Sequence, residues 1–250
     1  MSERIPRLFL GLSVAALLAV AAGLTLYWIN ATPRLTFTNT PLVPFGAAAE
    51  SSPAIPANVS LPVPYTPQAP LMDWAAMQHA CEEATVVMVD RYLRGDHSGA
   101  LIPATQAEKA INQVTAWKPY QDLTDAQLGE LAQKRLGWSY RIYPATPENI
   151  KRQLALGRPV IAGVRTHGLG NPNYPGYGDH HEQQGWSVSH YLVVAGYDAN
   201  TVILNDPGVT HGHGYHITFD QLFYAIKDLD QAYPNLNQGL IILVLAPTAS

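Results

Sequence analysis

The sequence predicts an α+β domain, because helical patterns come first along the chain and strand patterns gather after them. Between about residues 77 and 156, apolar residues recur at the i, i+3/i+4 spacing of amphipathic helices. From residue 159 to residue 246, short apolar runs rich in Val and Ile are bounded by turn residues. Two segments precede this domain, residues 1–30 and 31–60, and the domain itself covers residues 61–250.

The first segment has the composition of a membrane anchor. Arg4 and Arg7 precede an uncharged apolar run over residues 8–29, about the twenty residues that a membrane-spanning helix needs. Basic residues on its short side favour a cytoplasmic N-terminus. The alternative is a cleaved signal peptide with its small-residue site at residues 19–21. Both interpretations put the domain outside the cytoplasm, anchored to the membrane or, after cleavage, secreted.

The second segment, residues 31–60, is rich in Pro, Thr, Ala and Ser without a sustained period, which predicts an extended linker. The whole chain has one cysteine, which lies in the domain that follows. The core must therefore stabilise this domain without an internal disulfide. A formal net charge of −4 and the lack of basic clusters argue against nucleic acid as a partner. The sequence indicates no oligomeric state.

The first half of the domain is predicted to be helical. Residues 61–70 contain too many prolines for a central strand. Thr124 at the entry and Gly137 at the exit are good signals for the ends of one helix. The predicted helices cover residues 77–93, 105–117, 124–136 and 147–156.

The second half is predicted to supply the sheet. Residues 167–187 form a loop rich in Gly, Asn, Pro and Tyr, long enough for a functional lid or rim. The predicted strands cover residues 159–164, 189–196, 202–205, 215–218 and 240–246, with one helix at 219–227.

Cys81 is a candidate nucleophile because the start of a helix lowers the pKa of a thiol. A nearby imidazolium would lower this pKa further. The competing interpretation is a small buried hydrophobic residue, which most free cysteines are. Glu82 and Glu83 follow directly and suit the start of a helix, and we expect both side chains to point to solvent.

His190 and Asp206 are candidate partners of the thiol. His190 begins one strand, Asp206 follows the next strand, and residues 197–200 between them have a hairpin signature. A turn centred on Ala199 puts Asp206 across from Leu192, which shares a strand face with His190. A register slip of one residue would put Asn205 there instead. Either side chain could orient an imidazole, and Asp would also stabilise the imidazolium.

An oxyanion hole would complete such a site. The backbone N–H of Cys81 could donate one hydrogen bond, and a side-chain amide upstream could donate the other. Gln68 and Gln78 are the candidates for this amide.

The order and spelling of five short segments resemble the papain-like cysteine peptidases of the bacteriocin-leader-processing type, especially their stand-alone peptidase-like branch. The resemblance spans about residues 63–245. The segments are Val63-Pro-Tyr-Thr-Pro-Gln68, Ala80-Cys81-Glu-Glu-Ala84, Gly157-Arg-Pro-Val-Ile161, Ser189-His190-Tyr-Leu-Val-Val-Ala-Gly196-Tyr-Asp198 and Leu204-Asn-Asp206-Pro207.

This resemblance implies a papain-like α+β fold, with Cys81 on the first long helix and the N-terminal helices packed on a C-terminal antiparallel sheet. It implies Cys81 as nucleophile, His190 as base, Asp206 as orienter and Gln68 as the oxyanion-hole glutamine. The substrate would be a peptide or protein, with no cofactor. Two features depart from the family pattern: Glu82 stands where Gly commonly follows the cysteine, and residues 69–80 lengthen the usual interval from Gln68 to Cys81.

Two other functions remain open at the level of sequence. A papain-like domain without catalysis could serve as a binding module tethered to the cell envelope, which the Glu82 departure favours. A metal site is the other alternative, because neutral imidazole is a common zinc ligand. No pair of these histidines has helical i, i+4 spacing, so solvated loop residues are the favoured interpretation and no metal is expected. The histidines concerned are His180, His181, His211, His213 and His216.

Overall fold

The computed structural model describes residues 36–51, 53–118, 122–166, 169, 189–209, 211–234 and 239–249. The chain divides into two compact units, Met1–Thr36 and Phe37–Ser250. The predicted anchor at residues 1–30 and nearly all of the predicted loop at 167–187 lie outside the described residues. Among the residues that are described, no helix combines the length and the apolar character needed to cross a membrane.

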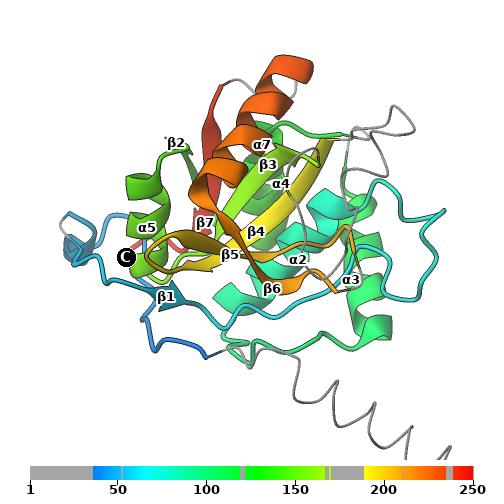
Figure 1. The fold of residues 1–250 in the computed structure, drawn as a ribbon. Helices are drawn as coiled ribbons and strands as arrows, with labels where there is room; N and C mark the ends of the chain where they lie inside the picture. The colour runs from blue at the N-terminus through cyan, green and yellow to red at the C-terminus, as the bar shows by residue number, and fades with distance from the viewer. Residues whose placement is uncertain are drawn as a thin grey trace, which may run out of the picture. The chain divides into compact units, whose positions relative to one another are not determined.

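A seven-stranded antiparallel sheet forms the centre of the described part of the second unit (Figure 1). Its strand order is β2-β7-β3-β4-β5-β6, and β1 pairs with β4. Strands β3, β4, β5 and β7 consist mainly of buried apolar residues, which explains why the sequence predicts them well. The strands are β1 (Val59–Ser60), β2 (Ser139–Pro144), β3 (Val160–Arg165), β4 (Ser189–Tyr197), β5 (Thr201–Asn205), β6 (His213–Thr218) and β7 (Ile241–Ala246).

Helices cover this sheet, as the predicted α+β class requires. Helix α2 packs against β4 and α3, α4 packs against β2 and β7, and α7 packs against β3. In Figure 1, α7 crosses in front of the strands. The helices are η1 (Ala48–Glu50), α2 (Cys81–Leu93), α3 (Ala104–Thr115), α4 (Asp125–Leu136), α5 (Pro147–Ala155) and α7 (Phe219–Ala232).

Helix α2 begins at Cys81, four residues later than predicted. A helix that began earlier would use the carbonyls of Met77 and Gln78 for its own N–H groups. Both carbonyls instead accept hydrogen bonds from the side-chain Nε2 of Gln68, at 2.8 and 3.1 Å. These contacts from outside the helix occupy both carbonyls, and α2 therefore begins late, at Cys81.

Strand β2 escaped prediction because it lies at the edge of the sheet. Its residues are all half-buried or exposed, and it pairs with β7 alone. An edge strand has less apolar sequence to reveal it, and Pro144 at its end suits an edge.

The described residues between 37 and 60 belong to the same compact unit as the domain, which differs from the extended linker predicted over 31–60; we call them the N-terminal strap. Phe45 is 2 % exposed and exchanges backbone hydrogen bonds with the C-terminal residues Pro247 and Ala249, each 2.8 Å long. The backbone N–H of Val43 donates to the carbonyl of Leu156 at 2.9 Å. The compact unit thus begins at Phe37. The strap, whose sequence has no sustained period, is held in place by partners far away along the chain.

Arg158 holds the strap from inside the domain. Its side chain is fully buried and donates to the carbonyls of Val43 and Pro44 at 2.7 and 2.8 Å. It also donates to the carboxylate of Glu50 at 2.9 Å and lies over the ring of Phe45. A buried guanidinium requires such partners, and these contacts attach the strap to the rest of the domain.

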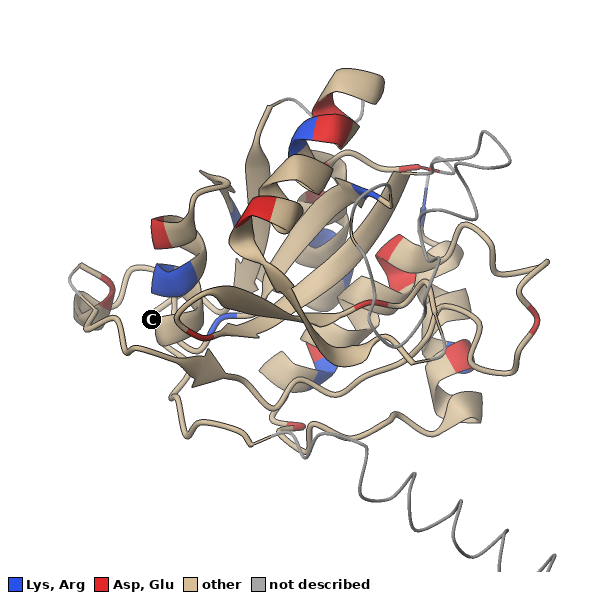
Figure 2. Cartoon of the chain, in the orientation of Figure 1, with Lys and Arg blue, Asp and Glu red and all other residues tan. Residues whose placement is uncertain are grey.

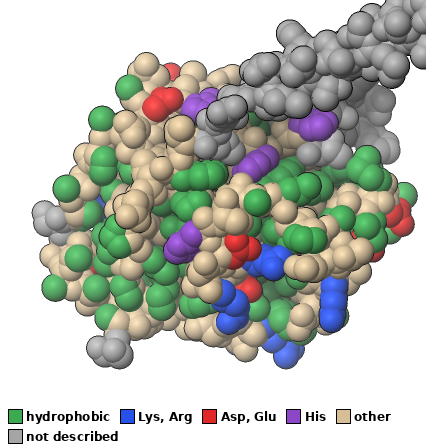
Figure 3. All heavy atoms as spheres, turned by 90° about the horizontal axis from the view of Figure 1, so that it is seen from below, with side chains coloured by type: hydrophobic (Ala, Val, Ile, Leu, Met, Phe, Trp, Pro, Cys, Tyr) green, Lys and Arg blue, Asp and Glu red, His purple; other side chains and the backbone are tan. Residues whose placement is uncertain are grey.

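Charged residues lie mainly on helices and loops, and the central strands are nearly free of them (Figure 2). On the face seen in Figure 3, acidic, basic, histidine and hydrophobic side chains are interspersed. This face therefore lacks the continuous basic surface that nucleic-acid binding favours.

Candidate active site

Cys81 occupies the first position of α2 and is partly buried. The residue before it, Ala80, caps the helix without any side-chain hydrogen bond. The N–H groups in the first turn of a helix carry partial positive charge, which stabilises an anion placed there. The chain therefore sets its one cysteine at the start of a helix that no side chain caps.

His190 and Asp206 form a buried pair. His190 Nε2 lies 2.7 Å from Asp206 Oδ1, and the two residues are 4 % and 0 % exposed. Burial lowers the pKa of His190, but the charge and hydrogen bond of Asp206, together with the Cys81 side chain, outweigh it and raise this pKa to about 10. Asp206 and, to a smaller extent, Cys81 therefore favour the imidazolium form of His190.

The predicted hairpin register brings this pair together. Val193 pairs with Asn205, so Asp206 lies across from Leu192 as predicted. A register shift between Val194 and Gly196 moves the turn end of the hairpin by one residue and leaves the end near His190 unaffected. The slipped register is excluded.

Asn205, the residue that the slipped register would have used, has a structural role. Its Nδ2 donates to the Val63 carbonyl at 3.2 Å, and its Oδ1 accepts from the Gly214 N–H at 3.1 Å. Both ends of this amide thus join β5 to neighbouring backbone, and neither is used on His190.

Further hydrogen bonds fix Asp206. Its Oδ1 accepts from the backbone N–H of Gly208 at 2.8 Å, and its Oδ2 accepts from the Tyr215 hydroxyl at 2.9 Å. Its backbone N–H donates to the carbonyl of Gly212 at 2.8 Å. Burial raises the pKa of Asp206, but His190 and these donors outweigh it and lower the pKa below its usual value. The carboxylate is therefore charged and rigidly held.

Gln68 lies between the two halves of the site. Its backbone N–H donates to the Pro207 carbonyl at 2.8 Å, next to Asp206. Its side-chain amide reaches the loop before Cys81, where both N–H groups bond to the carbonyls of Met77 and Gln78. Of the two glutamines considered from sequence, Gln68 is the one whose amide is oriented by the fold toward the start of α2, and Gln78 contributes a backbone carbonyl.

Glu82 and Glu83 are buried, at 3 % and 2 % exposed, so the prediction that they point to solvent is wrong. Glu82 binds the ammonium of Lys118 and accepts from the backbone N–H of Leu123 at 2.7 Å. Glu83 lies 3.2 Å from the same ammonium and accepts from the Thr115 hydroxyl at 3.0 Å. Burial raises the pKa of Glu82 to about 7, against the opposing effect of Lys118.

Several residues around the site were not found by sequence reasoning, because their partners lie far away in the chain. Tyr65 donates its hydroxyl to the Val209 carbonyl at 2.5 Å and stacks on His213 at 5.1 Å. Lys118 lies 36 residues from Glu82, beyond the reach of helical spacing. Tyr65 and Lys118 are polar side chains that the fold buries. Their presence in a sequence of low net charge is the one signal that could have pointed to them.

The histidine set considered for a metal does not converge in the described residues. His213 packs on Tyr65, and His216 lies by Thr201 and Asp198. His180 and His181 lie outside the described residues. Within the described ranges, no group of three or more His, Cys, Asp or Glu residues could hold a metal ion.

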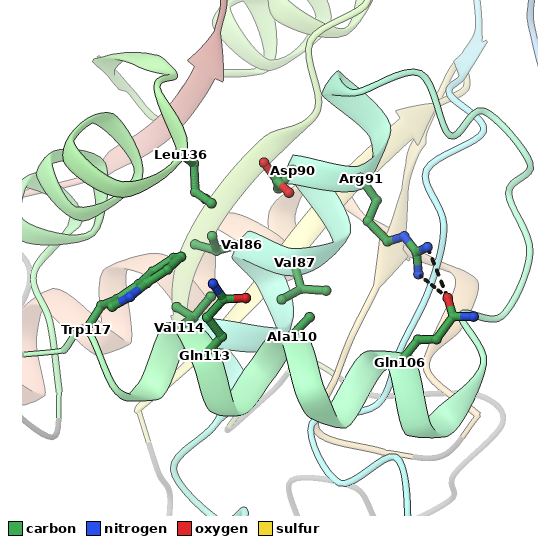
Figure 4. A pocket seen from close by; sticks show the side chains of 10 residues that line it. All are labelled: Val86, Val87, Asp90, Arg91, Gln106, Ala110, Gln113, Val114, Trp117 and Leu136. Carbon is green, nitrogen blue, oxygen red and sulfur yellow. Dashed lines mark hydrogen bonds between the residues drawn. The ribbon is translucent and has the colours of Figure 1, made fainter.

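Two cavities lie near α2. One, of about 260 Å³, is lined by Met77, His79 and Ala80, just before Cys81, and by Glu83 and Lys118. The other, of about 200 Å³, lies between α2 and α3 and is closed at one end by Trp117 and Leu136 (Figure 4). Arg91 and Gln106 bond across its mouth, and none of the Cys–His–Asp residues lines it. Of these two cavities, the first adjoins the residues just before Cys81.

Comparisons with known proteins bear on the family and the fold. The model of the Peptidase_C39 like family matches residues 60–239. A C39-like peptidase from Bacillus anthracis is similar in structure, with a TM-score of 0.50 and 16% identity, over 77% of this chain and 99% of that chain. Xylellain, a cysteine protease from Xylella fastidiosa, matches 87% of this chain and 99% of its own, at 13% identity and a TM-score of 0.34. No curated protein matches the sequence.

The family match covers well over half of the chain and includes Gln68, Cys81, His190 and Asp206. The Bacillus anthracis structure supports the fold independently. The papain-like resemblance read from the sequence is thereby confirmed at the level of family and fold. The chain belongs to the Peptidase_C39 like family and is a cysteine-peptidase-like hydrolase.

Proposed function

We propose that the domain is a thiol-dependent peptidase with Cys81 as nucleophile, His190 as general base and acid, and Asp206 as the residue that orients His190. One observation carries this proposal: a buried His190–Asp206 pair, 2.7 Å long, that meets a cysteine at the uncapped start of a helix. A nucleophile beside a base, with the base held in turn by an orienting carboxylate, is the arrangement of covalent acyl-transfer catalysis.

In this mechanism His190 takes the Cys81 proton, and the thiolate attacks the carbonyl carbon of a peptide bond. The tetrahedral intermediate collapses as His190 returns the proton to the leaving amine, so that a thioester to Cys81 remains. His190 then takes a proton from water, the hydroxyl attacks the thioester, and the thiol leaves with that proton. Asp206 stabilises the imidazolium in both halves, as the raised pKa of His190 reflects.

The oxyanion would be held by the backbone N–H of Cys81 and by Gln68. Both N–H groups of the Gln68 amide bond to backbone carbonyls, so the amide must exchange one of these bonds for the oxyanion. This engagement is the observation that favours the alternative function, a papain-like binding module without catalysis.

The reactivity of the thiol tests the proposal. We expect Cys81 to react with iodoacetamide at pH 7 about tenfold or more faster than a model thiol, because His190 and the helix start favour the thiolate. His190→Ala should abolish the acceleration, and Cys81→Ala should abolish labelling. Cleavage of a peptide library by wild type and not by Cys81→Ala would then identify the substrate. A wild-type rate equal to that of a model thiol sinks the peptidase and leaves the binding module.

We also propose that residues 1–30 anchor the chain in a membrane and leave the domain on the outer side. The support is the uncharged run over residues 8–29 behind two arginines. Membrane fractionation with protease added to intact cells tests it: the domain should sediment with membranes and be digested from outside. Digestion only after the cells are opened overturns the orientation, and recovery of a shortened chain in the medium indicates a cleaved signal.

A further inference from the structure

Glu82 follows the proposed nucleophile, Tyr191 follows the proposed base, and both bind the main chain of Leu123. Glu82 Oε1 accepts from the Leu123 N–H at 2.7 Å, and the Tyr191 hydroxyl donates to the Leu123 carbonyl at 3.1 Å. One residue between α3 and α4 thus holds the neighbours of Cys81 and His190 at the same time.

The three residues are shielded from water. Leu123, Glu82 and Tyr191 are 1 %, 3 % and 5 % exposed. Buried hydrogen bonds have no water to replace them, so each group must keep its partner or remain unsatisfied. The connection is therefore short, dry and stiff.

Other contacts fix the two side chains. The second oxygen of Glu82 binds Lys118, whose side chain is 6 % exposed. Gly163 lies on the neighbouring strand β3. A Cβ there would lie 3.3 Å from two ring atoms of Tyr191, so the lack of a side chain at Gly163 makes room for the ring. Burial first, and then the charges of nearby acidic groups, raise the pKa of Tyr191, which keeps its hydroxyl a donor.

We propose that Tyr191 and Glu82 are positioning residues, which hold His190 and Cys81 at their reacting separation through Leu123. The inference rests on the proposed peptidase function and adds to it the device that sets its geometry. Cys81 lies on α2 and His190 on β4, more than a hundred residues later in the sequence. A proton transfer between such distant segments needs sub-ångström placement, which supporting hydrogen bonds supply. Glu82, the departure from the family pattern, thus becomes part of the support of the site.

Tyr191→Phe is the sharpest test, because it removes one oxygen and leaves the ring. Tyr197→Phe is its matched control: Tyr197 lies on the same strand and donates its hydroxyl to a backbone carbonyl, that of Pro56, at 2.8 Å. We expect Tyr191→Phe to lower the alkylation rate of Cys81 at pH 7 and kcat by about tenfold, with KM changed by less than about twofold. Tyr197→Phe should change none of these by more than about twofold.

Two variants at Glu82 extend the test. Glu82→Gln keeps an acceptor for Leu123 and should retain most of the rate, whereas Glu82→Ala should match Tyr191→Phe. Because the two residues act through one partner, the double variant Glu82→Ala with Tyr191→Phe should be about as slow as either single one. Losses that multiply, or a rate for Tyr191→Phe equal to that of Tyr197→Phe, overturn the inference.

The result separates this inference from the proposed function. Where His190→Ala slows alkylation but Tyr191→Phe does not, the peptidase stands and the positioning role fails. Where wild type and His190→Ala react alike, the Cys81–His190 couple does not exist, and both fail. Thermal unfolding of Tyr191→Phe and Tyr197→Phe should show similar losses, since each variant gives up one hydroxyl-to-carbonyl bond.

Discussion

The backbone of Gly212 packs directly against the backbone of Asp206, the proposed orienter of His190. The Asp206 N–H donates to the Gly212 carbonyl at 2.8 Å, and a Cβ on Gly212 would lie 1.9 Å from the Asp206 carbonyl oxygen. No side chain fits there unless the backbone of one of these residues moves. The lack of a Cβ at Gly212 therefore allows the close backbone contact that helps to hold Asp206 in place.

Gly212→Ala should consequently damage both stability and site. We expect a loss of about 2 kcal/mol or more in the free energy of unfolding, because overpacking against backbone cannot be relieved by a rotamer change. The thiol reactivity that depends on Asp206 should fall as well. Urea denaturation and iodoacetamide labelling measure the two effects.

Gly95→Ala is the control for that substitution. Its Cβ would meet nothing within 4 Å, but its φ is +96°, so we expect a loss of about 1 kcal/mol and unchanged labelling. Equal losses in both variants would contradict the close approach at Gly212.

Asp206→Asn should move the alkaline limit of activity. The charge of Asp206 opposes the effect of burial and keeps the pKa of His190 at about 10. Without this charge, burial dominates, and we expect the pKa to fall by about two units or more. Since protonation of the leaving amine needs the imidazolium, the descending limb of kcat/KM against pH should shift down equally.

The control is Asp198→Asn, on the same hairpin but 46% exposed at its side chain. Its pH profile should match that of wild type. A descending limb that stays in place in Asp206→Asn would show that His190 does not set it.

Asp125 should make the domain less stable as pH rises toward neutrality. Burial first, and then the charge of Glu82, raise the pKa of this carboxyl from 3.8 to about 7. Between these values the folded chain binds the proton more tightly than the unfolded chain, so the free energy of unfolding falls as pH increases. Asp125→Asn removes the contribution of this group to the slope and should gain about 4 kcal/mol relative to wild type between pH 4 and pH 8, while Glu82, whose pKa is also raised to about 7, keeps its own contribution.

Urea denaturation at several pH values measures this slope. Asp220→Asn, also in the first turn of a helix but exposed, should leave the slope as it is in wild type. The same pH dependence in Asp125→Asn as in wild type would contradict the prediction.

Arg158→Met should release the N-terminal strap. It leaves the carbonyls of Val43 and Pro44 and the carboxylate of Glu50 without their buried donor, which should cost about 3 kcal/mol. Limited proteolysis should then cut within residues 37–50 before any other part of the domain.

Arg152→Met is the matched control, because that arginine is 37% exposed and pairs with Glu148 across 3.7 Å. Its loss should stay below about 0.5 kcal/mol. Proteolysis of Arg158→Met that begins elsewhere would show that the strap has other anchors.

Local signals in the sequence were sufficient where the determinants were local. Thr124 and Gln127 form a reciprocal capping box, and Gly137 ends the helix at φ +83°, so both ends of α4 are confirmed. The buried strands also follow from their own apolar runs. The placement of Asp206 across from Leu192, on the strand face of His190, followed from the hairpin register.

What the sequence did not predict depends on partners far away. The start of α2 depends on Gln68, the burial of Glu82 on Lys118, and the packing of the strap on Arg158. Each is one polar contact between segments with no shared periodicity, so no window of sequence contains both sides. The carboxylates after Cys81 looked like solvent residues because their cation lies 36 positions away.

The strap has a consequence for the order of folding during synthesis. Phe45 is among the first residues of the domain to leave the ribosome, yet its backbone partners are Pro247 and Ala249, among the last. Contacts that close so large a loop form late. Phe45 therefore lacks these backbone partners until Pro247 and Ala249 have been synthesised, and the strap can pack fully only after that point.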